Sequence, residues 1–176
     1  MEQSILSLLI FIPVIGAILM LPICKYLGAD KIKWTALITT GIQLLLSIWL
    51  YINFDPILTV ESSPFTVIVP WISHFNIYYF VGVDGLSMPM VLLTAMLSFI
   101  CIISSWKIEK KPLGYFSLFL LLDAGMMGVF LSLDFFLFYI FWEVMLLPMY
   151  FLIGMWGGPQ RHYAAIKFFL YTLFGS

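Results

Sequence analysis

Three ionisable side chains lie inside otherwise apolar runs of this sequence: Asp123, Glu143 and Lys167. The segment 134–151 reads DFFLFYIFWEVMLLPMYF, with Glu143 in its middle. A charge at the centre of a bilayer costs about 2.5–3.5 kcal/mol on insertion scales, so an ionisable residue there indicates a function by default. A carboxylate at such a depth can hold a proton and release it. We therefore take Glu143 as the first candidate for a functional residue inside the membrane.

The neighbours of Glu143 favour a polar environment. At 100° per residue, Tyr139 and Tyr150 fall on its face of a helix. Pro148 cannot donate to the carbonyl of Val144, which leaves an acceptor beside Glu143 and favours a kink. These features predict an inward-facing stripe that can hold water. The alternative is a glutamic acid that stays neutral and joins two helices.

Asp123 is a second candidate because of its depth. The segments on either side of Leu133 are joined by a short turn, and Asp123 and Glu143 each lie ten residues from it. At about 1.5 Å per residue, both carboxylates are roughly 15 Å from the turn. If they face each other, they will titrate as a unit. Whether they do is not decided by the sequence, and Asp123 also fits ordinary packing.

Two further candidates have simple structural alternatives. Lys167 lies about one turn into the last apolar segment and can extend to the headgroups, although Tyr163 and Tyr171 flank it at helical spacing. Asp134 directly precedes a helical run, as Asp84 does, and capping of free N–H groups accounts for both.

The composition identifies the setting of these residues. Apolar residues make up 63% of the 176 and charged residues 10%, and the mean hydropathy is +1.09. A soluble domain has about a quarter of its residues charged, so this composition indicates a membrane protein. A net charge of −1 gives no basis for a nucleic-acid partner. Cys24 and Cys101 lack metal or redox spacing, and without phosphate-loop or nucleophile motifs we expect no cofactor or metal in this chain.

The apolar runs predict an all-α, polytopic transmembrane helix bundle. About 20 apolar residues cross the hydrocarbon core, and five segments qualify: 4–24, 34–53, 83–106, 113–132 and 135–156. A sixth, 164–176, is too short to cross, so we expect this chain to be part of a longer protein.

The charges of the connections predict an orientation. Seven Lys and Arg residues occupy the connections on one side of the predicted membrane. In the connections on the other side, Asp and Glu occur but Lys and Arg do not. The positive-inside rule then places the amino terminus outside. The long connection 54–82 lies on the same outer side, and its β-branched and aromatic residues predict a β-hairpin or an aromatic cap on the headgroups.

Three motifs point to a family. The segments VGVDGLSMPM, FLSLDFFLFYIFWEVMLLPMYFLIGMWGG and YAAIKFFLYTLFGS resemble subunit M of the proton-pumping NADH:quinone oxidoreductase, respiratory complex I, called subunit 4 in mitochondria. The resemblance runs over residues 1–176. It implies the amino-terminal part of an antiporter-like membrane-arm subunit that contributes to proton translocation coupled to electron transfer from NADH to quinone.

The resemblance also assigns residues and partners. Glu143 matches the family's essential glutamate, which pairs with a lysine expected beyond Ser176. Asp134 and Lys167 match a recurring carboxylate and the lysine of the last motif; Asp123 matches no hallmark. NADH, FMN, iron–sulfur clusters and quinone are expected on partner subunits, and antiporter-like L- and N-type subunits and the lipid bilayer are the expected neighbours. The membrane is then the bacterial inner or the mitochondrial inner membrane.

Two alternatives stay open. One is a subunit of a multisubunit Na⁺(K⁺)/H⁺ antiporter, against which the motif KFFLYT argues. The other is a structural membrane fragment without transport activity. Exchange of Glu143 to Gln separates transport from structure, because only transport needs the ionisable group.

Overall fold

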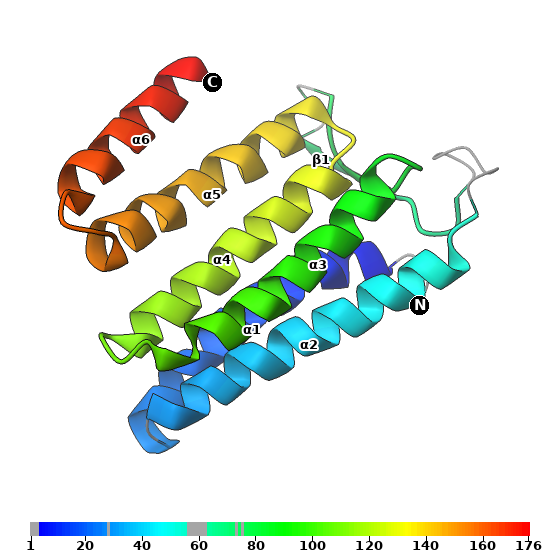
Figure 1. Cartoon of the computed structure of the whole chain (residues 1–176). Coiled ribbons are helices and arrows are strands. Elements are labelled where there is room, and N and C mark those ends of the chain that lie inside the picture. Colours follow the sequence, from blue (N-terminus) through cyan, green and yellow to red (C-terminus); the bar gives the residue numbers. More distant parts are fainter. Residues whose placement is uncertain (1–3, 28, 56–62, 73, 75) are drawn as a thin grey trace.

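The computed structural model describes residues 4–27, 29–55, 63–72, 74 and 76–176. Six α-helices account for most of them, and a β-hairpin and a short 3₁₀ turn after α3 belong to the connections (Figure 1). The elements are α1 (Ile5–Leu27), α2 (Ala29–Asn53), β1 (Val67–Ile72), β2 (Ile77–Val81), α3 (Ser87–Ser104), η4 (Ser105–Lys107), α4 (Pro112–Leu131), α5 (Phe135–Trp156) and α6 (Arg161–Gly175).

The predicted all-α membrane bundle is confirmed. Within the described residues, five helices are long and apolar enough to cross a membrane, and α6 is shorter, with 15 residues. Some bounds differ from the apolar runs. Helix α2 begins at Ala29 rather than at 34, because Lys31 and Lys33 continue the helix beyond its apolar part. Helix α3 begins at Ser87 rather than at 83, because Asp84 forms a turn ahead of it.

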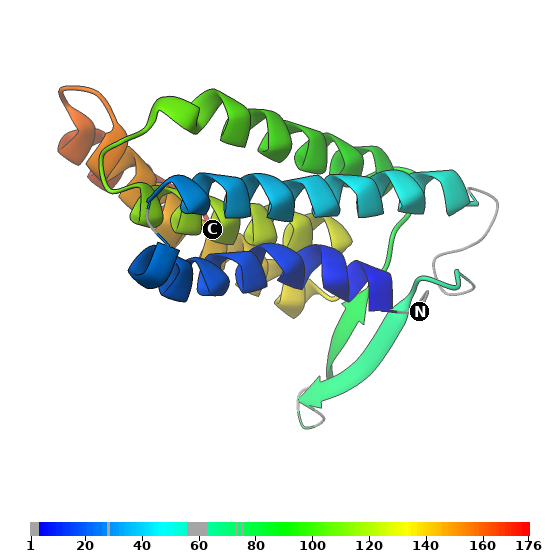
Figure 2. The same ribbon diagram turned by 90° about the horizontal axis from the view of Figure 1, so that it is seen from below.

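Helix α4 lies at the centre of the bundle. It packs against α1, α2, α3 and α5, whereas α6 packs on the outer side of α5. Figures 1 and 2 show α1 to α4 as a compact group, with α5 and α6 extending from one side of it. One apolar core, around Leu6, Met88 and Met127, fills the end of the bundle next to the hairpin. A second, around Met20, Ile32 and Phe116, fills the opposite end.

The hairpin predicted within 54–82 is present, although residues 56–62, 73 and 75 lie outside the described part. Strands β1 and β2 pair antiparallel, with Val67 opposite Val81. The main chain of β2 also bonds to the turn between α4 and α5: Gly82 N donates to Leu131 O and Leu133 N donates to Phe80 O, both at 2.9 Å. The hairpin is thereby attached to the turn that leads to Glu143, at the end of the bundle where α1 begins (Figure 2).

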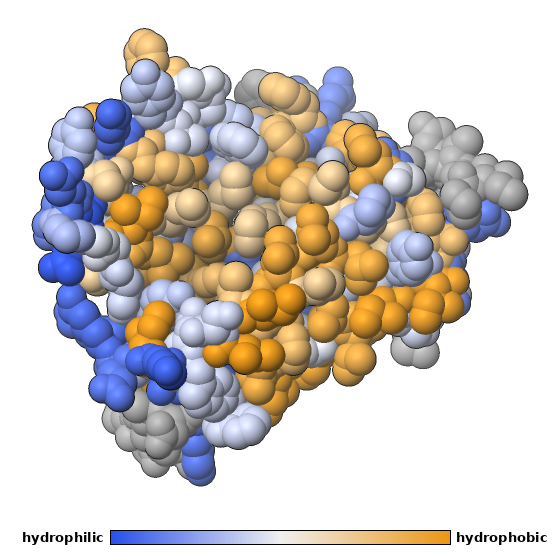
Figure 3. All heavy atoms as spheres, viewed as in Figure 1, coloured by the Kyte–Doolittle hydropathy of each residue, from blue (hydrophilic) through white to orange (hydrophobic). Residues whose placement is uncertain are grey.

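The surface of the bundle has the character expected in lipid. Many large apolar side chains are exposed, among them Leu45 and Ile52 on α2 and Leu97 on α3. Figure 3 shows a broad apolar area over the middle of the molecule, with hydrophilic residues gathered along one edge. Five apolar helices with such a surface identify an integral membrane protein.

Candidate functional site

Glu143 lies in the middle of α5, on the side that faces α6. Its carboxylate oxygen Oε1 accepts a hydrogen bond of 2.8 Å from the hydroxyl of Ser176, directly after α6. The phenol of Tyr139, one turn earlier on α5, is also hydrogen-bonded to this carboxylate. The side chain of Glu143 is half-buried. Two hydroxyl groups, one of them from the predicted neighbour Tyr139, therefore lie at a carboxylate in an otherwise apolar segment.

The packing of α4 on α5 determines where Glu143 points. A Cβ atom built on Gly125 of α4 would lie 2.8 Å from Cβ of Met145, so the two helices are in close contact there. Glu143 precedes Met145 by two residues, which on a helix is a rotation of about 160° to the far side. The contact between Gly125 and Met145 thus turns Glu143 away from α4 and towards α6.

The same geometry turns Asp123 the other way. Asp123 precedes Gly125 by two residues and so lies on the side of α4 opposite α5. It is fully buried, and its oxygen Oδ1 accepts a hydrogen bond of 2.5 Å from the hydroxyl of Ser98 on α3. Asp123 and Glu143 therefore do not form the facing pair that their equal depth left open.

Two uncharged polar residues that the sequence did not reveal as candidates, Ser98 and Gln43, lie beside Asp123. Gln43 of α2 is fully buried and is the second polar neighbour of the carboxylate. Its amide Nε2 donates to the carbonyl of Leu9 on α1 at 3.4 Å. The signal that could have found Gln43 and Ser98 is the presence of uncharged polar residues in long apolar spans, since such groups need internal partners there.

Two other residues named with Glu143 lie elsewhere. The ring of Tyr150 packs on Phe169 of α6, with their centroids 5.6 Å apart. Lys167 is exposed, with its Nζ atom 5.7 Å from the ring centroid of Tyr163. Lys167 also precedes Ser176 by nine residues, about 13 Å along a helix. The ammonium group is thus not at the level of Glu143.

Asp134 and Asp84 both cap helices. Asp134 Oδ1 accepts from the backbone N–H groups of Phe136 and Leu137 at the start of α5. Asp84 Oδ1 accepts from the N–H groups of Leu86 and Ser87 at the start of α3. These bonds, first the one from Ser87, hold the pKa of Asp84 below its ordinary value, because they favour the ionised form. Capping of both helices is confirmed.

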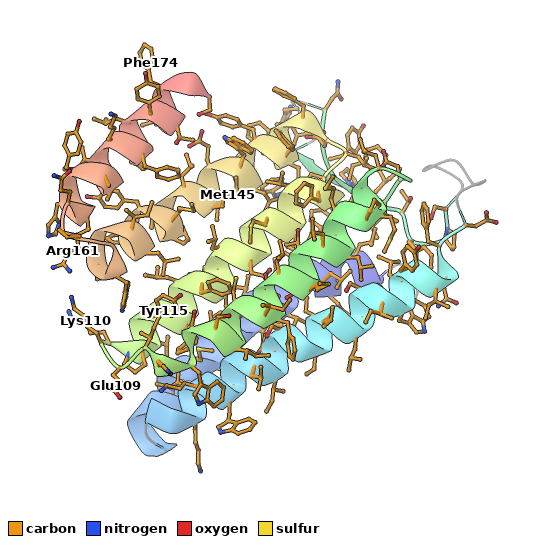
Figure 4. All side chains as sticks on the ribbon, in the orientation of Figure 1. Glu109, Lys110, Tyr115, Met145, Arg161 and Phe174 are labelled. Carbon is orange, nitrogen blue, oxygen red and sulfur yellow. The ribbon has the colours of Figure 1, made fainter. Side chains whose placement is uncertain are left out.

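The basic side chains gather at the end of the bundle opposite the hairpin. Figure 4 shows Glu109, Lys110 and Arg161 there, at the connections on either side of α4 and α5. Lys110 donates to the carbonyl of Met155, and the indole of Trp156 donates to the carbonyl of Lys110. Within the described residues, no three His, Cys, Asp or Glu side chains are grouped as metal ligands.

Comparison with known proteins finds similarity to membrane subunits of NADH-quinone oxidoreductase. The family model described as NADH:quinone oxidoreductase/Mrp antiporter, TM, matches residues 132–176, which include Glu143 and Lys167. NADH-quinone oxidoreductase subunit M of Rhodobacter capsulatus is 41% identical over 99% of this chain and 34% of its own length. The chain thus spans about a third of that relative. The resemblance to subunit M indicated by the motifs is confirmed.

Solved structures share the fold. Respiratory complex I from Thermus thermophilus has a chain that matches 97% of this one, with a TM-score of 0.79 and 24% identity, over 33% of its own length. The Mrp complex from Dietzia has a chain that matches 99% of this one, with a TM-score of 0.76 and 19% identity, over 18% of its own length. The helix bundle is therefore common to complex I and Mrp chains.

Proposed function

We propose that this chain, through its relation to subunit M, forms part of an antiporter-like membrane-arm subunit of NADH:quinone oxidoreductase. It contributes to proton translocation coupled to electron transfer from NADH to quinone, and Glu143 is the carboxylate that holds the proton in the membrane. Redox chemistry takes place on partner subunits, which carry the flavin, the iron–sulfur clusters and the quinone site. Antiporter-like L- and N-type subunits are the proposed neighbours.

One observation supports this proposal: Glu143 lies in the middle of an apolar helix that is long enough to span a membrane, and its carboxylate is partly open. Its carboxylate is half-buried, accepts from Ser176 and is bonded to Tyr139. Hydroxyl groups donate to an ionised carboxylate and accept from a protonated one, so both states find partners. A proton carrier needs both states and a route for the proton, and Asp123, which is fully buried, lacks such an opening.

The other candidates support the site less directly. Asp134 makes two capping bonds and accepts a third, of 3.4 Å, from Tyr78 N of the hairpin. Lys167 can reach the headgroups from its exposed position. We propose that both act around the site, Asp134 by fixing the start of α5 and Lys167 by its charge near the membrane surface.

The orientation is part of the proposal. The basic residues Lys107, Lys110, Lys111 and Arg161 belong to connections at one end of the bundle, and the hairpin lies at the other (Figures 2 and 4). The positive-inside rule then directs the hairpin and the amino terminus outside. The membrane is the bacterial inner membrane or its mitochondrial counterpart.

The test is Glu143→Gln in the complete complex, reconstituted into sealed vesicles. Glutamine keeps the shape and the hydrogen bonds but cannot carry a proton. We expect assembly to be unchanged and the number of protons moved per NADH oxidised to fall to the leak level. The control Glu109→Gln, at a glutamate in the connection before α4, should pump as the unmodified complex does. Unchanged pumping by Glu143→Gln would show that the assignment is wrong.

An antiporter that exchanges Na⁺ or K⁺ for protons is the second candidate, because the Mrp chain shares the fold. The same vesicles distinguish the two. Proton uptake driven by NADH supports complex I, whereas proton movement driven by a Na⁺ or K⁺ gradient without NADH supports the antiporter. A chain with neither activity in its complete complex would be a structural fragment.

A further inference from the structure

The buried cluster between α1, α2, α3 and α4 contains two oxygen atoms that lack a hydrogen-bond donor. They are Oδ2 of Asp123 and Oε1 of Gln43, and both residues are fully buried. A buried oxygen without a donor is costly, so native structures supply one. The cluster is separate from Glu143, which bonds on the other side of the α4–α5 pair.

The bonds that the cluster does make define what is missing. The hydroxyl of Ser98 donates to Asp123 Oδ1, and Nε2 of Gln43 donates to the carbonyl of Leu9. Gln43 and Asp123 are themselves hydrogen-bonding neighbours. Because Gln43 is a hydrogen-bonding neighbour of Asp123, a hydrogen on Asp123 Oδ2 could be donated to Gln43 Oε1. In that arrangement one proton would supply both oxygens and would join four helices in one chain of hydrogen bonds.

The charges around the cluster favour the same state. An ionised carboxylate that is fully buried needs a cation beside it. On α2, Lys31 and Lys33 precede Gln43 by ten residues or more, about 15 Å along the helix. Lys111, directly before α4, precedes Asp123 by twelve residues, about 18 Å. None of these cations is at the level of the carboxylate, whereas a neutral acid requires none.

We propose that Asp123 keeps its proton permanently and donates this acid hydrogen to the side-chain carbonyl of Gln43. This bond links α4 to α2, and the bond from Ser98 links α4 to α3. The inference does not depend on the role of Glu143. Asp123 then holds the bundle together as a neutral acid. It is a second titratable residue of the membrane interior, and it does not exchange its proton during transport.

Two substitutions of Asp123 test the proposal in the complete complex reconstituted in lipid. Asparagine reproduces the neutral acid, since its oxygen accepts from Ser98 and its NH₂ group donates to Gln43. We expect the midpoint of thermal unfolding of Asp123→Asn to stay within about 2 °C of the unmodified protein. Leucine has a similar size but no polar atoms, and Asp123→Leu should lower the midpoint by about 4 °C or more, because it leaves buried partners unsatisfied.

Infrared spectroscopy reads the proton directly and does not require the leucine variant to fold. At about pH 8, far above the ordinary range of aspartic acid, the unmodified complex should show the carbonyl band of a protonated carboxylic acid that Asp123→Asn lacks. Gln43→Leu should shift this band, because the acid loses its acceptor. Glu143→Gln controls for the other acid and should leave the band in place. The proposal is overturned if Asp123→Asn removes no such band, or destabilises as much as Asp123→Leu.

Discussion

Asp123 and Glu143 lie at similar depth on adjacent helices but point to opposite sides of the pair. The Asp123 carboxylate accepts from Ser98 of α3, and the Glu143 carboxylate accepts from Ser176 beyond α6. The reason is the close contact of Gly125 with Met145, since each carboxylate precedes one of these residues by two positions. Two acids at one level are thus kept in separate environments.

The first prediction concerns their independence. Residues without shared partners usually have additive effects on stability, within about 0.5 kcal/mol. We therefore expect the changes in unfolding free energy of Asp123→Asn and Glu143→Gln to add in the double variant. The measurement is a double-mutant cycle from thermal or denaturant unfolding in detergent. A coupling above about 1 kcal/mol would mean that the carboxylates interact and that the orientation described here is not the one in solution.

The second prediction concerns another close contact between α4 and α5, one turn of α4 beyond Gly125. A Cβ atom on Gly128 of α4 would overlap the ring of Phe141 of α5 near its root, where the ring cannot turn aside. Overpacking of this kind costs about 1–3 kcal/mol, and we expect Gly128→Ala to lose that much unfolding free energy. Gly41→Ala is the matched control, because its Cβ would meet only Phe99 at an ordinary 3.6 Å. In mid-helix, this change should be neutral or stabilising by up to about 1 kcal/mol.

Much of the fold follows from the sequence because lipid imposes simple rules. An apolar run of about 20 residues must be a helix, so α4 (112–131) and α5 (135–156) have nearly the expected bounds. The hairpin follows from the β-branched and aromatic residues of the connection 54–82. The caps follow because Asp84 and Asp134 directly precede apolar runs, where free N–H groups need acceptors.

The direction of each carboxylate does not follow, because α4 and α5 are apolar on every side. The periodicity of apolar residues identifies the buried face of a helix only where the opposite face is polar. Here the lipid and the protein core are both apolar, so the pattern does not distinguish the two faces. The useful signal was Gly125 and Gly128, small residues that mark the contact with α5. Gln43 was missed for a related reason: an uncharged residue carries no insertion cost as large as that of a charge, although it needs partners just as much.

The third prediction separates two roles of Asp134. Loss of a helix cap typically costs about 1 kcal/mol, so Asp134→Ala should lower the unfolding free energy by this amount. Asp134→Asn keeps an oxygen for Phe136 N and Leu137 N and should leave stability nearly unchanged. Proton pumping by the complete complex then decides the role. Pumping by Asp134→Asn at the unmodified level agrees with capping, whereas its loss would assign Asp134 to the proton route.

The last prediction concerns the orientation of the bundle, which determines the direction in which Glu143 would pass its proton. The β-hairpin and the connection between η4 and α4 lie at opposite ends (Figure 2). A cysteine placed at Tyr78 of the exposed hairpin surface and one placed at Glu109 should therefore be on different sides of the membrane.

The measurement uses a maleimide that cannot cross membranes, with Cys24 and Cys101 replaced by alanine in both variants. In intact cells, Tyr78→Cys should react because the hairpin is outside. Glu109→Cys should react only after the membrane is permeabilised, because the basic connections are retained inside. The reverse pattern would place the amino terminus inside and would invert the proposed path. Reaction of both variants in intact cells would mean that α3 does not span the membrane.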